Sequence, residues 1–377
     1  MTASGTRSGP RVWLLLGDKV GDNRQVERVA AALGWPCAVK RLVFRPRWRQ
    51  GKPPFLASLA AVDLRASDPL VPPWPDLILT IGRRPAMAAL WLRRRSGGRT
   101  RIVLFGRPKR FFDRFALLVA PVQYGLPEHA RVVRLGLPLI RLDRARLEAE
   151  AERWRARLAE LPRPLTVLLV GGRTRPYRLD GAVASDLLER TVAAMPAGGG
   201  LYVSTSRRTP AAVVRALRRD LPAGARLHGF GESGGENPYL ALLALGDRFV
   251  VTGDSVSMLT EIASLGRPLA IYPLPEEARR LRRWQDALLR WPPTAALVRT
   301  LETSGLFGWP RDLGALHALL RARGWASRLG DPPACGGPAP EDELERVVAR
   351  IHALFPDDAP RSAPPTSEDT EAPCSDG

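Results

Sequence analysis

Residues 251–268 read VTGDSVSMLTEIASLGRP and contain the parts of one strand, turn and helix unit. An apolar run at 248–252 predicts a strand, and small hydroxyl residues then lead into a helix predicted over 255–265. A Gly-Arg-Pro turn returns the chain to another apolar run at 268–273. A strand, a helix and a second strand in this order are typical of a parallel sheet that helices cover.

The same alternation runs through most of the 377 residues, and it restarts after a long charged helix predicted at 142–161. In the first half, helices include 25–33 and 85–95, and strands are predicted at residues 12–17, 38–44, 76–82, 101–106, 115–120 and 132–136. In the second half, strands are predicted at 165–172, 201–205, 226–230, 248–252 and 268–273, and helices at 182–194, 211–219, 238–245 and 255–265.

This pattern predicts an α/β fold made of two successive blocks. The first domain is placed at residues 1–160 and the second at 161–335. A helix at 341–354, within the segment 336–355, is expected to return and pack on the first domain. Residues 356–377 are rich in Pro, Ser, Asp and Glu, so this tail should be disordered.

The chain carries a formal net charge of +19, mostly from arginine. Such a surface attracts nucleic acid, phosphorylated metabolites or anionic lipid, but a GC-rich genome also produces an excess of Arg, Ala and Pro. Segments 44–52 and 107–115 interleave cations with aromatic residues. They are candidates for contact with anionic lipid or with RNA, and solvated loops are the alternative. Nucleic acid is not the partner we expect.

The three cysteines and four histidines are widely spaced. They predict neither a disulfide framework nor a metal site, which fits a reducing compartment. The apolar run at residues 12–16 is too short for a secretion signal, and no run approaches the roughly 20 apolar residues that span a bilayer. We therefore expect a cytoplasmic protein that is at most peripheral on the inner face of the membrane.

The segment GDKVGDNRQ, residues 17–25, follows the first predicted strand. Glycines between a strand and a helix let backbone N–H groups approach an anionic ligand. Asp18 and Asp22 are the carboxylates placed to act as a general base toward an acceptor hydroxyl. The alternative is a turn without a ligand, in which Asp22 or Asn23 caps the helix.

Two further segments follow predicted strands of the second block. Gly171 and Gly172 open the crevice at the end of a strand, where Arg173 would address phosphate, and a plain tight turn is the alternative. The hydroxyls and arginines of STSRRTP, residues 204–210, suit a diphosphate. The alternative there is an exposed arginine pair, with Thr209 as the cap of the next helix.

The segment quoted first adds contacts for phosphate and ribose. Ser255 and Ser257 lie at the start of the predicted helix, where their hydroxyls can donate to phosphate oxygens. Glu261 lies about two turns further along, where a carboxylate can accept both hydroxyls of a ribose. The alternative for Glu261 is an ordinary exposed helix residue.

Residues 253–268 resemble the signature helix of glycosyltransferases with the B-type fold (GT-B), including the MurG-like group, in which a glutamate binds the ribose of UDP. From about residue 11 to about residue 290 the chain resembles the mitochondrial-fission ELM family of plants and bacteria, which is described as a glycosyltransferase family. The motifs that carry this resemblance, in matching order, are GDKVGDNRQ, DLILTIGRRPA, TSRRTP, ENPYLALLALGD and VTGDSVSMLTE. The resemblance implies two Rossmann-like domains that face each other across a cleft, the first on the acceptor side and the second binding a nucleotide-sugar.

Residue by residue, the resemblance implies that the first domain lines the cleft with Gly17, Asp18, Lys19, Gly21 and Gln25. On the second domain it implies Ser206, Arg207, Arg208, Thr209, Asn237, Asp254, Ser255, Ser257, Met258 and Glu261. Many relatives carry a histidine where this chain has Asp22, and a His-Asp pair where it has Gln123 and Tyr124. If that histidine is the catalytic base, Asp22 must replace it or the activity is altered.

The function expected from the sequence is a metal-independent glycosyltransferase that moves a sugar from a nucleoside-diphosphate sugar to a hydroxyl acceptor. No cofactor is expected, because arginines and a helix N-terminus would stabilise the departing diphosphate. Cell-envelope glycan synthesis with a lipid-linked acceptor, near an anionic membrane, is one setting for it. The alternative is a non-catalytic interaction protein that kept the GT-B fold, as the plant relatives' link to mitochondrial division suggests. A third class is polyanion binding driven by charge.

Overall fold

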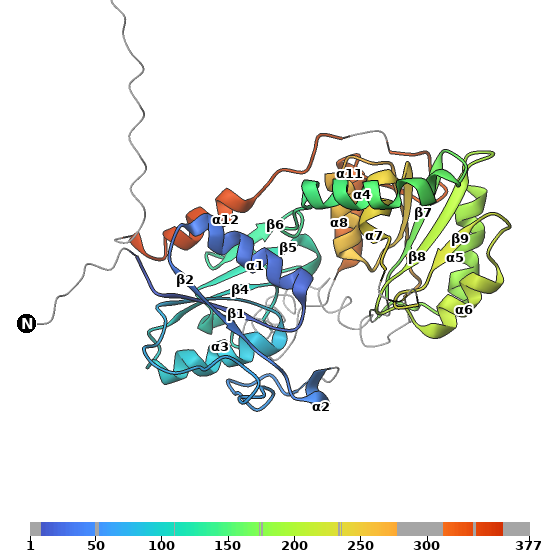
Figure 1. Ribbon diagram of the computed structural model, residues 1–377. Coiled ribbons are helices and arrows are strands. Elements are labelled where there is room, and N and C mark those ends of the chain that lie inside the picture. The colour runs from blue at the N-terminus through green and yellow to red at the C-terminus, as the bar shows by residue number, and fades with distance from the viewer. Residues whose placement is uncertain are drawn as a thin grey trace, which may run out of the picture.

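The computed structural model describes residues 9–49, 53–108, 110–172, 174, 176–232, 234, 236–276, 312–334 and 337–356. The chain forms two six-stranded parallel sheets, and helices cover both faces of each sheet (Figure 1). The predicted α/β architecture with two Rossmann-like domains is confirmed.

The first sheet has the strand order β2-β1-β3-β4-β5-β6. Its strands are β1 (Val12–Leu16), β2 (Cys37–Arg41), β3 (Leu77–Ile81), β4 (Arg101–Phe105), β5 (Leu117–Pro121) and β6 (Val132–Leu135). Strand β1 reads VWLLL and all five of its residues are buried, because it pairs with β2 and β3 and has helices on both faces. This explains why inner strands of the sheet read as continuous apolar runs.

Two long helices cover the first sheet, α1 (Val20–Leu33) on one face and α3 (Arg83–Arg95) on the other. Three short elements complete the domain: α2 (Pro46–Arg49) and the 3-10 turns η1 (Phe112–Arg114) and η2 (Val122–Tyr124). Helix α2 had been expected as part of a loop. It lies at the edge of the first domain that faces the second (Figure 1).

The second sheet has the strand order β12-β11-β10-β7-β8-β9. Its strands are β7 (Leu165–Val170), β8 (Gly200–Thr205), β9 (Arg226–His228), β10 (Arg248–Thr252), β11 (Leu269–Tyr272) and β12 (Ser327–Arg328). Its helices are α4 (Arg144–Ala159), α5 (Gly181–Ala193), α6 (Ala211–Arg219), α7 (Tyr239–Leu245), α8 (Val256–Ser264) and α11 (Leu313–Ala322). The sequence did not predict α11 or β12.

The last helix, α12 (Leu344–His352), packs on α1 of the first domain. Its buried residues Val347 and Ile351 join the hydrophobic cluster beneath α1. The Trp35 ring contacts the rings of His352 and Phe355, with centroids 4.8 and 5.6 Å apart. The last described residues of the chain therefore lie against the first domain.

The two domains meet at η2 and α11. The backbone N–H of Asp312, the N-cap of α11, donates to the carbonyl of Gln123 in η2 at 2.9 Å. Val122 packs against the hydrophobic core of the second domain. The backbone of η2 is thus held by both domains.

The cation-rich segments differ from the expectation. Phe44, Phe112 and Phe115 are 2%, 5% and 0% exposed, because their rings fill the core of the first domain. They offer no stacking surface for RNA bases. Among the residues described, no helix has both the length and the apolar composition needed to cross a membrane.

Candidate functional site

On the first domain, the loop between β1 and α1 is shorter than expected, because the helix was predicted to begin at residue 25. Helix α1 begins at Val20, so Asp22 and Asn23 lie in its first turn, and the N-cap is Lys19 without a side-chain hydrogen bond. The prediction that Asp22 or Asn23 caps this helix was wrong. Asn23 Nδ2 instead donates back to the carbonyl of Gly17 at 2.8 Å, which ties the helix to the end of β1.

Asp18 is held by an arginine from α3. Both Asp18 carboxylate oxygens accept from Arg84, each at 3.1 Å. The same guanidinium donates to the carbonyl of Trp48 at 2.7 Å and lies 4.3 Å from the centroid of Phe44. Arg84 therefore fixes Asp18 beside α2.

Asp22 has a looser environment than Asp18. Its carboxylate lies 3.6 Å from Lys19 Nζ, and the two side chains are 42% and 62% exposed. Gly21 has open space around its Cα, and Gln25 is half-buried on the next turn. The Asp18 side chain is similarly exposed, at 45%, so the two candidate bases differ in their partners: within the described residues, only the oxygens of Asp18 accept side-chain hydrogen bonds.

On the second domain, Gly171 and Gly172 sit where three loops meet at the carboxyl ends of β7, β8 and β10. A Cβ on Gly171 would lie 2.2 Å from Ser255 Oγ and 2.5 Å from Asp254 Oδ1. A Cβ on Gly172 would lie 2.3 Å from the Cβ of Arg208. Both positions need glycine because neighbouring loops approach the backbone closely.

Asp254 holds this junction from inside. It is 3% exposed, and its Oδ2 accepts from the backbone N–H of Gly172 at 3.0 Å and from Thr174 Oγ1 at 3.4 Å. Its Oδ1 is buried and has no hydrogen-bond partner among the residues that the structure describes. Burial raises the pKa of Asp254, while hydrogen bonds and the nearby Arg208 oppose the rise. Asp254 thus serves as an anchor for the glycine loop.

The loop after β8 presents the two predicted arginines. Thr209 Oγ1 donates to the carbonyl of Gly171 at 2.5 Å and accepts from the backbone N–H of Ser206 at 2.9 Å. The N-cap of α6 is Pro210, so the alternative that Thr209 caps this helix was wrong. Arg207 and Arg208 are exposed, and neither guanidinium forms an ion pair or hydrogen bond within the described residues.

The start of α8 lies against the glycine loop. Ser255 is the N-cap residue and is 4% exposed, whereas Ser257, in the first turn, is exposed. Met258 packs partly into the core of the domain. Asn237 Oδ1 accepts from the backbone N–H of Tyr239 at 3.0 Å at the start of α7. Of the two predicted phosphate-binding hydroxyls, the one on Ser257 is open.

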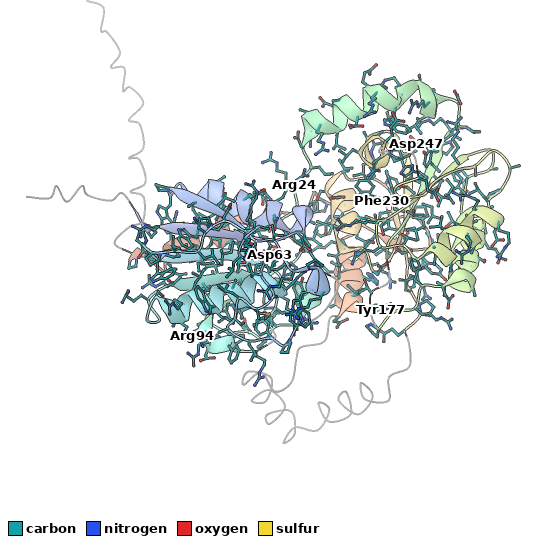
Figure 2. The ribbon with its side chains drawn as sticks, turned by 60° about the horizontal axis from the view of Figure 1, so that its bottom comes forward. Arg24, Asp63, Arg94, Tyr177, Phe230 and Asp247 are labelled. Atoms are coloured by element: carbon teal, nitrogen blue, oxygen red, sulfur yellow. The ribbon has the colours of Figure 1, made fainter. Side chains whose placement is uncertain are left out.

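Glu261 is not a solvent-exposed helix residue. Its carboxylate accepts a hydrogen bond from the hydroxyl of Tyr239, a contact that joins α8 to α7. Burial raises the pKa of Glu261, while the Tyr239 hydrogen bond and the positive charge of Arg24 oppose the rise. Arg24 belongs to α1, and Figure 2 places it on the side of the first domain that faces the second. Burial also raises the pKa of Tyr239.

The structure thus gathers the predicted glycines, the Arg207–Arg208 loop and the start of α8 at one edge of the second sheet. Glu261 and Asn237 lie beside them and are linked through Tyr239. Arg173 lies outside the described residues. Sequence reasoning missed Tyr239 and Arg24, since they lie 22 and 237 positions from Glu261 and no local motif connects them.

A family model described as mitochondrial fission ELM1 matches residues 20–305. The chain belongs to this family. Mitochondrial fission protein ELM1 of Arabidopsis thaliana is 25% identical over 283 residues, which cover 67% of this chain and 66% of that protein. The chain therefore spans just under two thirds of the length of this ELM1 relative. Protein RP120 of Rickettsia prowazekii is 23% identical over 300 residues, covering 69% of this chain and 82% of that protein.

Solved structures similar to this ELM1-family chain include a glycosyltransferase from Rickettsia africae, at 12% identity and a TM-score of 0.42, covering 83% of this chain and 97% of that chain. The UDP complex of MnaA from S. aureus has 10% identity and a TM-score of 0.49, covering 92% and 97%. UDP-GlcNAc 2-epimerase from Methanocaldococcus jannaschii has 11% identity and a TM-score of 0.47, covering 91% and 99%.

Gln123, which follows β5, lies at the domain junction of this ELM1-family chain. Gln123 is 3% exposed, its carbonyl accepts from the backbone N–H of Asp312, and its Oε1 has no hydrogen-bond partner in the described part of the chain. The side chain of Gln123 is a buried amide, and an amide does not accept a proton as an imidazole does. Gln123 therefore does not take over the role of a catalytic histidine.

One histidine that the sequence did not single out touches the candidate site. His317 of α11 places Nε2 2.8 Å from the carbonyl of Gly253, and its ring occupies the space that a Cβ on Gly253 would need. Burial lowers the pKa of His317, so the neutral ring donates from Nε2 to this carbonyl. Through Asp312, the same helix also contacts the first domain. His317 thus connects the loop before α8 to the domain junction.

Proposed function

We propose that this ELM1-family chain is a glycosyltransferase that moves a sugar from a nucleoside-diphosphate sugar to a hydroxyl acceptor between its two domains. The observation that carries the proposal is the meeting of three strand-end loops on the second sheet. They bring two unpaired arginines, Arg207 and Arg208, beside the N-terminus of α8. Strand carboxyl ends of this kind are where α/β sheets bind nucleotides.

The diphosphate would bind to Arg207, Arg208 and the first turn of α8. Guanidinium groups match phosphate oxygens in geometry and charge, and free backbone N–H groups at a helix start add to the attraction. The exposed hydroxyl of Ser257 adds a neutral donor. These groups would stabilise the charge that develops on the leaving diphosphate, so the reaction as proposed needs no metal ion.

The ribose would bind to Glu261. The Tyr239 hydroxyl occupies Oε2 of this carboxylate and fixes its orientation, which leaves Oε1 for a sugar hydroxyl. A carboxylate that accepts two hydroxyls, here that of Tyr239 and one of the ribose, does so best in its ionised form. Arg24 from the opposite domain favours the ionised form of Glu261. The donor would therefore bind best with the first domain near the second.

Asp22 would act as the general base toward the acceptor hydroxyl, with Asp18 as a positioning residue. Both Asp18 oxygens are engaged by Arg84, while Asp22 has only an exposed lysine beside it. A base must reach the proton that it removes, and the long ion pair of Asp22 with an exposed lysine is displaced more easily than the two hydrogen bonds that hold Asp18.

The acceptor would be carried on a lipid, with the protein peripheral on an anionic membrane. A shallow cavity of about 590 Å³ beside α2 is lined by Arg45, Arg47, Leu64 and Arg65, and by Asp63, whose carboxylate accepts from the backbone N–H of Arg65. Exposed arginines around an exposed leucine suit anionic headgroups above acyl chains. Because Trp48 of α2 is joined to Asp18 through Arg84, this surface lies next to the proposed acceptor side.

A second candidate is a non-catalytic interaction protein that kept the fold. The name of the Arabidopsis relative favours it, and so does the engagement of Asp18 by Arg84. In that case the second domain would bind no nucleotide-sugar. The two candidates are separated by one binding experiment.

That experiment is isothermal titration of the protein with UDP-, ADP- and GDP-sugars. The proposal predicts that at least one of them binds and that Glu261→Ala weakens this sugar by about tenfold or more. Glu148→Ala, at an exposed position on α4, is the control and should bind as the wild type does. If none of the sugars binds, the transferase proposal is wrong and the interaction protein is favoured.

A further inference from the structure

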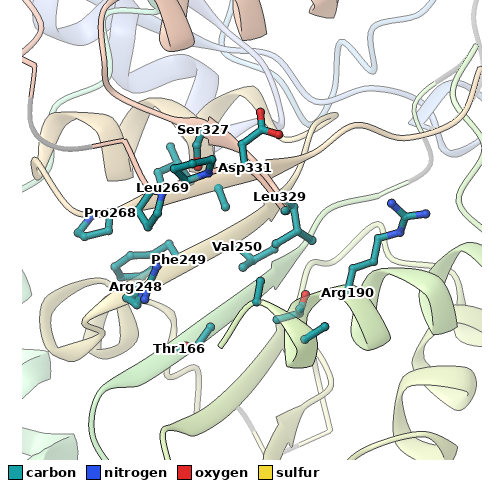
Figure 3. Close-up of a pocket in the computed structure, with 17 residues that line it drawn as sticks. Thr166, Arg190, Arg248, Phe249, Val250, Pro268, Leu269, Ser327, Leu329 and Asp331 are labelled. Atoms are coloured by element: carbon teal, nitrogen blue, oxygen red, sulfur yellow. The ribbon is translucent and has the colours of Figure 1, made fainter. Parts of the chain in front are cut away.

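A cavity of about 450 Å³ opens at the amino ends of the strands of the second sheet, on the edge opposite the candidate site (Figure 3). We call it the amino-edge cavity. Its walls come from the starts of β7, β10 and β11, the last turn of α5 and the segment after β12. The residues that matter for its chemistry are Thr166, Arg190, Arg248, Phe249, Leu269 and Leu329.

The floor of the amino-edge cavity is apolar and rigid. Phe249 and Leu269 are 1% and 2% exposed and belong to one hydrophobic core, while Leu329 is 7% exposed and belongs to the other. The apolar surface that a ligand can reach therefore comes mainly from Pro268, Ala270 and Pro332. Cavities of a few hundred Å³ with apolar walls and a few polar groups are typical of small-molecule sites. The floor therefore suits a flat apolar body of one or two rings.

Two charged side chains of the lining form no ion pair within the described residues, the half-buried Arg248 and the exposed Asp331 (Figure 3). Because Arg248 is less exposed to water, its charge is less screened and acts more strongly on a ligand inside the cavity. Arg190, which Figure 3 shows on the other side of the cavity, is paired with Asp186 at 2.9 Å, and Asp186 also accepts from Tyr272 at 2.5 Å. Arg248 forms no ion pair or side-chain hydrogen bond within the described parts of the chain. An unpaired guanidinium at the edge of an apolar wall attracts an organic anion.

A polar group without a partner lies in the same wall. Thr166 is 3% exposed, and no described residue forms a hydrogen bond with its hydroxyl. Thr166 and Arg248 are register partners on the adjacent parallel strands β7 and β10. A buried hydroxyl without a partner is costly, and a rotation about χ1 would offer it to a ligand oxygen beside Arg248.

An adjoining cavity of about 350 Å³ lengthens this surface. It shares Arg248 and Pro268 with the amino-edge cavity, and it adds Arg267 and Trp325. Trp325 is half-buried and its indole N–H donates to the carbonyl of Pro338. A second cation and an aromatic ring near Arg248 favour the same kind of ligand, a ring system that carries negative charge.

We propose that the amino-edge cavity is a second ligand site, for a small organic anion with a flat apolar body. Arg248 binds the anionic group, Thr166 donates to it, and Pro268, Ala270 and Pro332 contact the ring. The site is separate from the nucleotide-sugar site because β10, five residues long, places the two at its opposite ends, roughly 17 Å apart.

The test is isothermal titration with three probes of similar size: 1-naphthoate, phenyl phosphate and the cation benzylamine. We expect at least one anionic probe to bind with a Kd near or below about 1 mM, and benzylamine not to bind. Arg248→Gln should weaken the anion about tenfold, and Thr166→Val, which keeps the side-chain shape, about threefold. Arg215→Gln, at an exposed position on α6, is the matched control and should leave binding unchanged.

Three results would overturn the proposal: no anionic probe binds, Arg248→Gln binds as tightly as the wild type, or benzylamine binds as well as the anions. Thermal unfolding of each variant verifies that it is folded. Glu261→Ala should leave probe binding unchanged, so a failure of the nucleotide-sugar proposal does not affect this test. Loss of probe binding in Glu261→Ala would place the probes in the other site and contradict the inference.

Discussion

The hydroxyl of Tyr239 donates a hydrogen bond to the carboxylate of Glu261, within the body of the second domain. The two residues come from different helices, α7 and α8. A carboxylate in such a place is oriented by its donor and loses much of its contact with water. This pair therefore couples the stability of the domain to the protonation of Glu261.

The pH dependence of that coupling can be predicted in sign. Burial raises the pKa of Glu261 above its ordinary value of 4.5 in the folded protein. Protonated Glu261 therefore stabilises the folded protein fully at pH values below the pKa that Glu261 has in the unfolded chain. This stabilisation is lost as the pH rises through the pKa that Glu261 has in the folded protein. Glu261→Gln keeps an acceptor for Tyr239 and cannot ionise. We expect its stability relative to the wild type to increase from pH 4 to pH 7.

Urea unfolding at pH 4 and at pH 7 measures this difference. Glu148→Gln, on the exposed face of α4, is the control and should show the same relative stability at both pH values. A Glu261→Gln variant whose stability relative to the wild type does not change with pH would contradict a raised pKa.

Two glycine substitutions test whether position 171 needs glycine because neighbouring loops pack closely against it. Gly171→Ala places a methyl group 2.2 Å from Ser255 Oγ, so we expect a loss of about 2 kcal/mol in the free energy of unfolding. Gly21→Ala is the matched control, because nothing lies within 4 Å of the added methyl group. There we expect no loss, and up to about 0.5 kcal/mol of gain, since alanine favours the helix. Chemical denaturation measures both, and equal effects would show that the loops around Gly171 can move apart.

Binding to vesicles tests the proposed membrane surface. The variant Arg47→Glu/Arg65→Glu removes two exposed cations beside α2. We expect at least about a fivefold loss of co-flotation with vesicles that contain 30% phosphatidylglycerol, because each basic residue near an anionic surface contributes about 1 kcal/mol. Arg94→Glu/Arg99→Glu makes the same charge change at the far end of α3 and is the control. Equal losses in both variants would mean that net charge, and not this surface, determines binding.

The fold could be predicted from the sequence because the inner strands are distinctive. Runs such as VWLLL in β1 and LTVLLV in β7 are buried on both faces, so they are apolar at every position except Thr166. Strand β12 has only two residues and gives no such signal. Helix α11 was not predicted, because only the Pro-Gly break that follows it was recognised in this region. The apolar face of the helix can be identified only from its packing against the sheet.

The candidate site was predictable where local motifs carry it and not elsewhere. The strand-end glycines and the hydroxyl-rich helix start can be recognised because each directly follows a predicted strand. The cap of helix α1 was predicted wrongly, because the Asn23 side chain donates to the carbonyl of Gly17 and does not cap the helix. The partners Tyr239 and His317 depend on contacts between elements distant in sequence, which no periodicity encodes.

The central claim is that Arg207 and Arg208 recognise a diphosphate, and a phosphate series tests it most directly. Isothermal titration would compare the nucleoside, its monophosphate and its diphosphate, for the base preferred in the nucleotide-sugar panel. The account predicts that affinity rises with each phosphate, and that the rise shrinks about tenfold or more in Arg207→Gln/Arg208→Gln but persists in the control Arg215→Gln/Arg321→Gln. Equal affinity for all three ligands, or a rise that the first double variant leaves intact, would contradict it.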